Sequence, residues 1–300
     1  MKVLSRPKGN AEEYGRWSVN LYKGCPHGCK YCYLKKGVWS NTLGGSKPEL
    51  RAGLLNDVHA YHVAMVEILE HKDEIICDGG LFMSFITDPM CEENRTNFLC
   101  LAEIVARYGI PVTILTKSSS FASIPAFQRI FANNLIFCGW TLTGHDELEP
   151  NAPSNGLRIK AMNELCMWGC NVWASIEPVI DFDSSLDMII LAISAGCRHF
   201  KIGLLTNNTR VVRKDFSFGK FKFKAYDHDE CIKFIHDVMK HTKGLATVYW
   251  KQSFREFLGE EDFARATVGY ENIVGKDWTP FNLKIMLEID FQEFLENYKE

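Results

Sequence analysis

The chain has 300 residues, of which 46% are hydrophobic, and its formal net charge is −3 with a sequence pI near 6.3. A chain of this length is able to bury one large core, and its acidic balance excludes a global positive field, so any nucleic-acid contact must use a local patch. No apolar run approaches the ~20 residues that a membrane span needs, and the first residues, "MKVLSRPKGN", lack the apolar core of a signal peptide. We therefore expect a cytoplasmic protein with no membrane span.

Eleven cysteines are spread along the chain. Their odd number and wide spacing favour reduced thiols in a reducing compartment over a disulfide framework. Seven of them stand among apolar residues, and we predict that they are small core side chains. These seven are Cys77, Cys100, Cys138, Cys166, Cys170, Cys197 and Cys231.

Apolar, strand-like runs alternate with helix-like segments along most of the chain. Strands are expected at residues 17–22, 81–86, 111–116, 135–143, 171–180 and 199–205, and helices at 55–71, 92–108, 155–168 and 184–195. Strict alternation predicts a parallel sheet with right-handed crossovers. We predict an α/β fold: a partial (βα)6 barrel of the TIM type over residues 1–208, with a carboxyl-terminal α/β extension over 209–300 packed on it.

A polar loop follows the first strand in the stretch "KGCPHGCKYCYLKK", residues 23–36. Its three cysteines are Cys25, Cys29 and Cys32. Gly24 and Gly28 allow the backbone to fold tightly around a bound object. Three thiolates suit a [4Fe-4S] cluster held at three irons, with the fourth iron open to an outside ligand. A structural zinc loop that uses His27 as a fourth ligand, or a chance grouping, remain as alternatives.

Polar residues also stand where the next four strands end. In a barrel of parallel strands these carboxyl ends form the active-site rim. Hydroxyl and aspartate side chains there also serve as helix caps, which is an equal interpretation for Asp88 and Ser118. Lys117 and Glu177 follow apolar strands directly, where a charge is costly without a partner. Glu177 is a candidate catalytic residue that would bond a ribose hydroxyl or a substrate amine.

The cysteine loop resembles the signature of radical S-adenosylmethionine enzymes, Cys-x3-Cys-x2-Cys with an aromatic residue, here Tyr31, before the third cysteine. The resemblance implies an enzyme whose open iron binds the amino and carboxylate groups of S-adenosylmethionine. It also implies that one electron, from a donor such as flavodoxin or ferredoxin, cleaves the sulfonium and releases a 5′-deoxyadenosyl radical, which abstracts a substrate hydrogen.

Four further blocks, "TDPMCEENR", "PVTILTKS", "LEPNAPSNGLRIKAM" and "KIGLL", resemble successive blocks of the spore photoproduct lyase-like proteins over about residues 17–205. The cluster block shares tyrosines on both sides of the third cysteine, Tyr31 and Tyr33. The resemblance implies that Lys117 binds the carboxylate of S-adenosylmethionine. Hydroxyls on the same rim are expected to contact the cofactor too. They are Thr87, Thr141, Thr143 and Ser175.

One departure from that branch concerns the hydrogen donor. Spore photoproduct lyases carry a cysteine on the second strand that returns a hydrogen atom to the substrate radical, and here Phe85 takes that place. Cys91 follows nearby but is expected to be structural, because it begins a predicted helix. Tyr31 and Tyr33 are therefore candidate catalytic residues that quench the radical, as is return of the hydrogen from 5′-deoxyadenosine.

Basic and aromatic residues interleave in "RVVRKDFSFGKFKFKAY", residues 210–226, which is typical of a β-hairpin around Gly219. The hairpin either lays its phenylalanines on the barrel with its lysines in water, or grips nucleic acid through cations and a stacking ring. Spore photoproduct lyases place a hairpin in the same position to hold a flipped-out lesion. The candidate contacts are Arg213, Lys214, Lys220, Phe221, Lys222 and Lys224.

These observations favour a radical S-adenosylmethionine enzyme, with lyase or isomerase chemistry, that acts on a nucleobase or modified pyrimidine in DNA. Two alternatives stay open: the same chemistry on a peptide or small metabolite, and a metal-stabilised binding module without catalysis. Iron and sulfide content separates the last from the others. Salt-dependent affinity for DNA separates the first two.

Overall fold

The computed structural model describes residues 2–36, 40–207, 210–275 and 279. The strands are β1 (Leu4–Ser5), β2 (Ser18–Val19), β3 (Tyr22–Lys23), β4 (Glu49–Leu50), β5 (Leu81–Met83), β6 (Val112–Thr116), β7 (Ile136–Thr141), β8 (Asn171–Val179), β9 (His199–Leu204), β10 (Thr206–Asn207), β11 (Arg210–Val211), β12 (Phe216–Phe218), β13 (Phe221–Phe223) and β14 (Thr247–Trp250). The α-helices are α1 (Ser40–Leu43), α2 (Asp57–Glu70), α3 (Lys72–Cys77), α4 (Arg95–Arg107), α5 (Pro125–Phe131), α6 (Asn155–Met167), α7 (Phe182–Ser194), α8 (His228–Thr242), α9 (Gln252–Leu258) and α10 (Glu260–Thr267). Short 3-10 helices are η1 (Gly9–Ala11), η2 (Tyr33–Lys35) and η3 (Asp146–Leu148).

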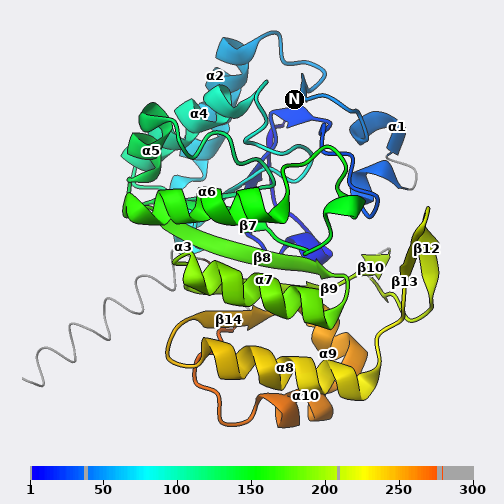
Figure 1. Cartoon of the computed structure of the whole chain (residues 1–300). Helices are drawn as coiled ribbons and strands as arrows, with labels where there is room; N and C mark the ends of the chain where they lie inside the picture. The colour runs from blue at the N-terminus through cyan, green and yellow to red at the C-terminus, as the bar shows by residue number, and fades with distance from the viewer. Residues whose placement is uncertain (1, 37–39, 208–209, 276–278, 280–300) are drawn as a thin grey trace, which may run out of the picture.

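One sheet organises the molecule, in the strand order β1-β2-β5-β6-β7-β8-β9-β14 (Figure 1). Its strands from β2 onward pair in parallel, and β1 pairs with β2 in the antiparallel sense. The six strands predicted from the sequence are β2 and β5 to β9, and the α/β fold is confirmed. The boundary at residue 208 stays a prediction, although β14 shows that the later part of the chain adds a strand to the same sheet.

The sheet curves around an aromatic interior. Phe82 on β5, Phe137 on β7, Trp173 on β8 and Tyr249 on β14 form one buried cluster. Strands lie about 4.8 Å apart, so β5 and β14 would be more than 20 Å apart on a flat sheet. The Tyr14 ring spans this interior, because its centre lies 5.8 Å from the Phe82 ring on β5 and 4.5 Å from Nζ of Lys251, which follows β14. The sheet therefore curves into a partial barrel. A glycine is required at position 139 on β7, because a Cβ there would collide with the Trp173 ring.

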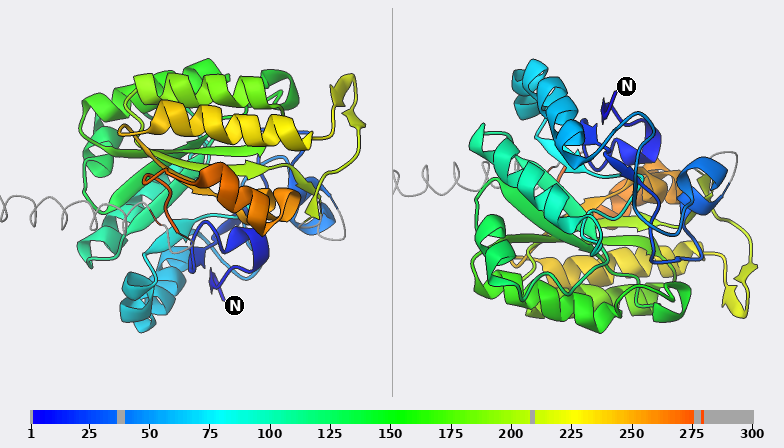
Figure 2. Two further views of the ribbon diagram at one scale, coloured as in Figure 1. Left: turned by 90° about the horizontal axis from the view of Figure 1, so that it is seen from below. Right: turned by 90° about the horizontal axis from the view of Figure 1, so that it is seen from above.

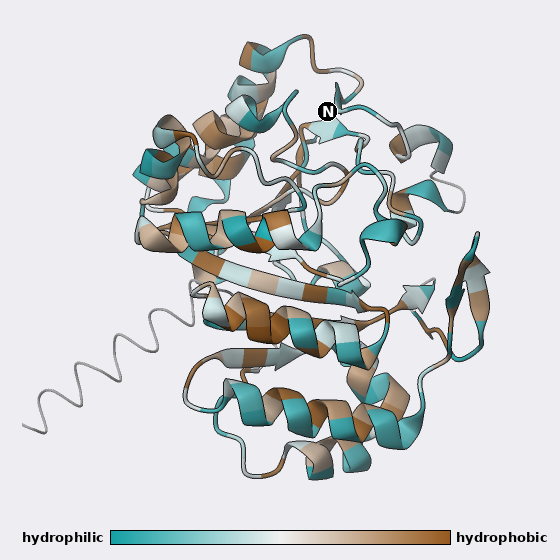
Figure 3. Ribbon diagram, viewed as in Figure 1, coloured by the Kyte–Doolittle hydropathy of each residue, from teal (hydrophilic) through white to brown (hydrophobic). Residues whose placement is uncertain are grey.

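Helices cover the outer face of the sheet. The predicted helices are confirmed as α2, α4, α6 and α7, and three of them begin at a side-chain cap: Asn56 for α2, Ser154 for α6 and Asp181 for α7. Helix α8 buries Cys231, Phe234, Ile235, Val238 and Met239, a spacing of three and four residues that leaves hydrophilic positions outward (Figure 3). No helix in the described part of the chain is long and apolar enough to cross a membrane. The helix expected from the sequence "DFQEFLENYKE" lies outside the described residues.

An amino-terminal strap, residues 9–15, crosses the open side of the barrel. The views in Figure 2 place this dark blue segment beside the orange helix α9. Asn10 donates to Thr206 Oγ1 at 3.3 Å, and the Glu13 carboxylate accepts hydrogen bonds from the Tyr249 hydroxyl and the Gln252 amide at 3.0 and 2.7 Å. The strap therefore connects the amino-terminal part of the chain with β10, β14 and α9 across the open side of the sheet.

The cysteine prediction is correct in part. Cys138, Cys170, Cys197 and Cys231 are buried, and Cys166 is half-buried, but Cys77 and Cys100 are exposed. Cys77 ends the short helix α3, and Cys100 lies on the outer face of α4 between two buried leucines. Apolar neighbours in the sequence therefore misled the prediction, because on a helix adjacent residues point in different directions. All eleven cysteines are free thiols.

Candidate active site

The cysteine loop follows β3 and lies at the end of the barrel toward which the parallel strands point. Gly24 and Gly28 both have positive φ, 84° and 70°, and a side chain at Gly24 would collide with the Lys47 carbonyl. The Cys25 amide donates to the Gly45 carbonyl at 2.9 Å, and the Lys30 amide donates to the Leu148 carbonyl at 2.9 Å. The loop is thus held on both sides by backbone hydrogen bonds.

Cys25, Cys29 and Cys32 have different surroundings within this loop. Cys29 is buried, while Cys25 and Cys32 are half-buried. Burial raises the pKa of Cys29 to about 11, although the positive charge of Lys117 opposes this effect. Burial also raises the pKa of Cys32, against the influence of the Leu34 amide and Lys117. Metal binding would displace these protons.

This donor set fits an iron–sulfur cluster. Three thiols from one rigid loop are close enough for their charges to interact, and Lys117 supplies a compensating positive charge. Thiolates are the ligands that iron–sulfur clusters use. A cluster at these three cysteines stays a prediction, and the structure places Lys117 close enough to interact with Cys29 and Cys32.

His27, between the first two cysteines, belongs to a buried polar network. Its Nε2 lies 2.8 Å from Asp88, and the Asp88 carboxylate also accepts hydrogen bonds from Thr116 Oγ1 and the Lys117 amide at 2.6 and 2.8 Å. Burial alone would raise the pKa of Asp88, but the His27 charge and these hydrogen bonds lower it to about 2. Asp88 therefore joins the cysteine loop to the end of β6 and fixes the backbone of Lys117.

Lys117 extends from the end of β6 over the Tyr31 ring, with its Nζ 5.5 Å from the ring centre and 3.9 Å from Glu149. Glu149 is fully buried and pairs with the fully buried Arg158 at 2.6 Å. The Tyr31 hydroxyl donates to the same carboxylate. Burial disfavours the Lys117 charge, but the neighbouring Cys29 and Glu149 outweigh it and raise the pKa of Lys117. Lys117 thus remains cationic in a mostly dry position.

The predicted hydroxyl residues divide into two groups. Thr141 on β7, Ser175 on β8 and Lys201 on β9 are register partners, so their side chains form one row facing the barrel interior. Thr87 donates to the Gly24 carbonyl at 2.6 Å and supports the cysteine loop. The Thr143 hydroxyl accepts from the His145 amide at 3.3 Å and belongs to the turn after β7.

Glu177 lies in a second polar network, at the carboxyl ends of β8 and β14. Its carboxylate oxygens are 2.7 and 2.8 Å from Lys251 Nζ, and the Tyr14 hydroxyl donates to it. Tyr14 also contacts Ser175 Oγ at 2.7 Å. The sequence analysis predicted that the Glu177 charge needs a partner. That partner is Lys251, which follows β14.

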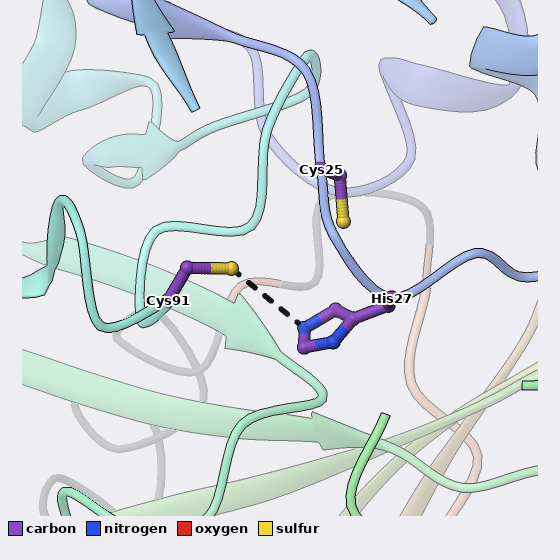
Figure 4. A group of neighbouring side chains, drawn as sticks. All are labelled: Cys25, His27 and Cys91. Atoms are coloured by element: carbon purple, nitrogen blue, oxygen red, sulfur yellow. Dashed lines mark hydrogen bonds between the residues drawn. The ribbon is translucent and has the colours of Figure 1, made fainter. Parts of the chain in front are cut away.

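Tyr33 and Phe85 meet beside the cysteine loop. The Tyr33 side chain is 64% exposed, and its hydroxyl donates to the Phe85 carbonyl. The Phe85 ring stacks on Phe82 at 4.4 Å and so joins the aromatic interior. Cys91 is buried in the turn before α4, where its Sγ lies 3.9 Å from His27 Nε2 (Figure 4).

The predicted hairpin is present as β12 and β13, with Phe216 paired with Phe223. It lies at the end of the barrel where the arrowheads of β8 and β9 point (Figure 1). Phe218 and Phe223 are buried against Leu148, Ile180 and Leu205. These two rings therefore attach the hairpin to the barrel.

The other predicted hairpin residues have varied surroundings. Phe221 is half-buried and meets the His145 ring edge-on at 5.1 Å. Arg213 donates to the Glu256 carbonyl at 2.8 Å, and Lys224 lies 3.6 Å from Glu230. Three further lysines are exposed, and they are the cations that a ligand would meet first. They are Lys214, Lys220 and Lys222.

Several residues of these networks were not singled out from the sequence. Glu149 and Arg158 stand in the quoted block "LEPNAPSNGLRIKAM" but gave no periodic signal. Lys251 follows the apolar strand "ATVYW" directly, and the rule that selected Lys117 and Glu177 would have selected it. Tyr14 carried no signal, because it comes from an irregular strap.

Comparison with known proteins shows which solved structures share this fold. No family model matches the chain. Spore photoproduct lyase complexed with dinucleoside spore photoproduct superposes with a TM-score of 0.59 and 14% identity, over 79% of this chain and 77% of that one. This chain shares the fold of spore photoproduct lyase. A variant of the same lyase with bound AdoMet and dinucleoside spore photoproduct gives a TM-score of 0.58 at 13% identity, over 79% of this chain and 76% of that one.

Two further matches cover a smaller share of the other protein. SuiB of Streptococcus suis bound to S-adenosylmethionine matches with a TM-score of 0.51 and 14% identity, over 82% of this chain and 53% of that one. The uncharacterized protein MJ0683 of Methanocaldococcus jannaschii is 26% identical over 175 residues, which are 55% of this chain and 61% of that protein. At these identities the likeness to the solved structures concerns the fold.

Proposed function

We propose that the protein is a radical S-adenosylmethionine enzyme that holds a [4Fe-4S] cluster at Cys25, Cys29 and Cys32. The observation that carries this proposal is the rigid three-thiol loop at the mouth of a partial barrel, with the buried cation Lys117 beside it. The fold shared with spore photoproduct lyase supports it. When bound, the cluster and S-adenosylmethionine supply a one-electron cleavage that generates a hydrogen-abstracting radical.

The residues of the chain would orient these groups and exclude water. Lys117, held over Tyr31 and beside Glu149, is placed to donate a charge-assisted hydrogen bond to a carboxylate of the cofactor. Thr141 and Ser175 offer hydroxyls on the interior row. The aromatic interior around Trp173 closes the barrel beneath them. Exclusion of water by such an interior would protect a reactive radical from side reactions.

We assign a nucleobase or modified pyrimidine in DNA as the substrate class. The exposed lysines of the β12–β13 hairpin lie at the mouth of the barrel, and a neighbour of the same fold binds a dinucleoside spore photoproduct. Contacts between these lysines and phosphates would position the DNA strand, while the hairpin phenylalanines hold the hairpin on the barrel. An electron donor such as flavodoxin or ferredoxin and a reducing cytoplasm complete the proposal, in agreement with eleven free thiols.

The test is anaerobic reconstitution with iron and sulfide, followed by reduction in the presence of S-adenosylmethionine. We expect about four irons and four sulfides per chain, and formation of 5′-deoxyadenosine and methionine. Alanine at Cys25, Cys29 or Cys32 should abolish both. A zinc-loaded protein with full activity would overturn the proposal. If the cluster and cleavage are present but DNA binding is absent, the substrate moves to the peptide or small-metabolite class.

A further inference from the structure

Three metal-binding side chains converge beside the cysteine loop in a set that differs from the predicted cluster ligands. Cys25, His27 and Cys91 place one ligand atom each within 4.8 Å of one another (Figure 4). Cys91 and His27 are 3% and 5% exposed. Of the three, only Cys25 belongs to the Cys-x3-Cys-x2-Cys motif. Cys91 comes from the turn before α4, which is remote in sequence.

His27 is prepared as a ligand. Asp88 binds its Nε2 at 2.8 Å, and Nδ1 is buried with no hydrogen-bond partner among the described residues. Asp88 is itself fixed by hydrogen bonds from the Met90 and Lys117 amides, both at 2.8 Å. A carboxylate that holds and orients the imidazole is the usual support of a metal-ligating histidine. A buried nitrogen without a partner is costly unless a ligand uses it.

The spacing suits a small tetrahedral ion. Zinc bonds of about 2.3 Å to sulfur and 2.0–2.1 Å to nitrogen place ligand atoms roughly 3.5–3.8 Å apart. The three ligand atoms lie within 4.8 Å of one another, and Cys91 Sγ lies 3.9 Å from Nε2 of the imidazole. Because Asp88 holds Nε2, rotations of the imidazole and of the two thiols bring Nδ1 to the spacing that zinc requires. Two thiolates and one imidazole are a ligand set that zinc prefers, with water in the fourth position.

We propose that Cys25, His27 and Cys91 form a mononuclear Zn²⁺ site that shares Cys25 with the cluster. Because one thiolate is common to both, occupation of the zinc site excludes assembly of the cluster at Cys25. Cys91 then has a role of its own, as the residue that determines which metal the apoprotein takes. The zinc site requires only the described geometry, so it stands whether or not the cluster supports catalysis.

The experiment compares single variants of cluster-free protein kept reduced with a phosphine. The exposed thiols Cys77 and Cys100 are changed to serine throughout, to remove adventitious sites. Zn²⁺ affinity is measured by competition with a chromophoric chelator, and Co²⁺ absorption reports tetrahedral thiolate ligation. We expect one tight site per chain in the parent protein, an affinity within about twofold for Cys29→Ala, and a loss of at least 100-fold for Cys91→Ala and Cys25→Ala.

Assembly of the iron–sulfur cluster, followed by its absorption, tests the same competition for Cys25 from the side of iron. Cys91→Ala should assemble the iron–sulfur chromophore like the parent, Cys29→Ala should not, and prior zinc loading should block assembly in the parent but not in Cys91→Ala. Equal zinc affinity in Cys91→Ala and the parent would overturn the proposal, as would loss of zinc in Cys29→Ala. If Cys91→Ala is less soluble, Cys91→Ser retains the volume and tests the same ligand, with its melting temperature as the folding control. Failure of S-adenosylmethionine cleavage in the parent would contradict the proposed function and leave the zinc result unaffected.

Discussion

The Glu177 carboxylate and the Lys251 ammonium form a buried ion pair, with Nζ 2.7 and 2.8 Å from the two carboxylate oxygens. The side chains are 18% and 2% exposed, and they come from the ends of β8 and β14. Gly203 on β9 lies beneath them, where a Cβ would stand 2.9 Å from Lys251 Cδ and 3.0 Å from Glu177 Cδ. The pair therefore ties three strands together at the mouth of the barrel.

Removal of one partner should be strongly destabilising. Lys251→Met leaves Glu177 and the nearby Glu13, 3.4 Å from Lys251 Nζ, without this cation, and we expect a loss of about 3–5 kcal/mol in the free energy of unfolding. The double variant Glu177→Gln, Lys251→Met should regain part of that loss. Arg255→Met, which breaks the exposed pair with Glu260 at 3.0 Å, is the control and should cost under about 1 kcal/mol. Chemical denaturation measures all three, and a Lys251 variant as stable as the control contradicts the buried-pair interpretation.

Lys117 should set cofactor affinity without setting cluster content. Lys117→Met keeps the side-chain stem over Tyr31 and removes a charge-assisted hydrogen bond of about 1.5–3 kcal/mol, so affinity for S-adenosylmethionine should fall tenfold or more. Iron content should be unchanged, because Lys117 is not one of the three proposed cysteine ligands and the backbone hydrogen bonds that hold the loop remain. Equilibrium dialysis of the reconstituted protein measures the affinity, with Lys30→Met, an exposed lysine of the same loop, as the control. Unchanged affinity would assign Lys117 to the substrate or the fold.

The hairpin contact should depend on pH through His145. Its Nδ1 lies 2.7 Å from Glu147, its Nε2 bonds Asp181, and Ser184 Oγ is 3.0 Å away. Burial opposes the His145 charge, but the hydrogen bonds to Asp181 and Glu147 outweigh it and raise the pKa of His145. A raised pKa stabilises the fold below the unfolded value of about 6.5, and this contribution is lost as pH rises through the folded value.

The stability difference between the parent and His145→Gln should therefore be largest near pH 6 and shrink toward pH 9, by the same titration. Melting temperatures across this range measure it. A gap between parent and His145→Gln that widens as pH rises would show that the neutral imidazole is the stabilising form.

The exposed lysines of the hairpin should determine the salt dependence of DNA binding. Changing Lys220, Lys222 and Lys224 to glutamine should reduce the slope of log affinity against log salt by about 0.7–0.9 for each phosphate that these lysines no longer neutralise. A variant with glutamine at the exposed positions Lys160, Lys240 and Lys243 has the same net charge and should retain the parent slope. Equal slopes in the two triple variants would place DNA elsewhere or exclude it.

Phe221 separates a stacking role from a packing role. Because its ring meets His145 and the cluster around Leu148, Phe221→Ala should lower the melting temperature. A ring that stacks on a base would also lose about 1–3 kcal/mol of binding. Lower stability with unchanged DNA affinity assigns Phe221 to packing, and the reverse result would contradict the packing seen here.

The barrel was predictable because each strand is a continuous apolar run between amphipathic helices, a pattern that parallel pairing requires. Lys117 and Glu177 were selected correctly as charges in need of partners, and the structure gives each one a partner. The partners themselves were not predictable. Glu149 lies 32 residues after Lys117 and Lys251 lies 74 residues after Glu177, and only the curvature of the sheet brings them together.

Cys91 was predictable as a buried thiol, but the side chains that it approaches were not. Its position before a helix indicated a structural thiol, and it is indeed buried. Its approach to Cys25 and His27 depends on two loops from different strands meeting at the same edge of the sheet. Spacing along the chain carries no information about such an approach, because the cysteine motif and Cys91 belong to separate segments.

The strap gives the barrel a fixed order of closure during synthesis. Glu13 and Tyr14 leave the ribosome long before Tyr249 and Lys251, the residues that receive them. Because nascent chains begin to fold from the amino-terminal end, the cysteine loop and β5 to β9 emerge while one side of the barrel is still open. The contacts of Glu13 and Tyr14 with Tyr249 and Lys251 are therefore among the last in the barrel to form, and this side stays open until those two residues have left the ribosome.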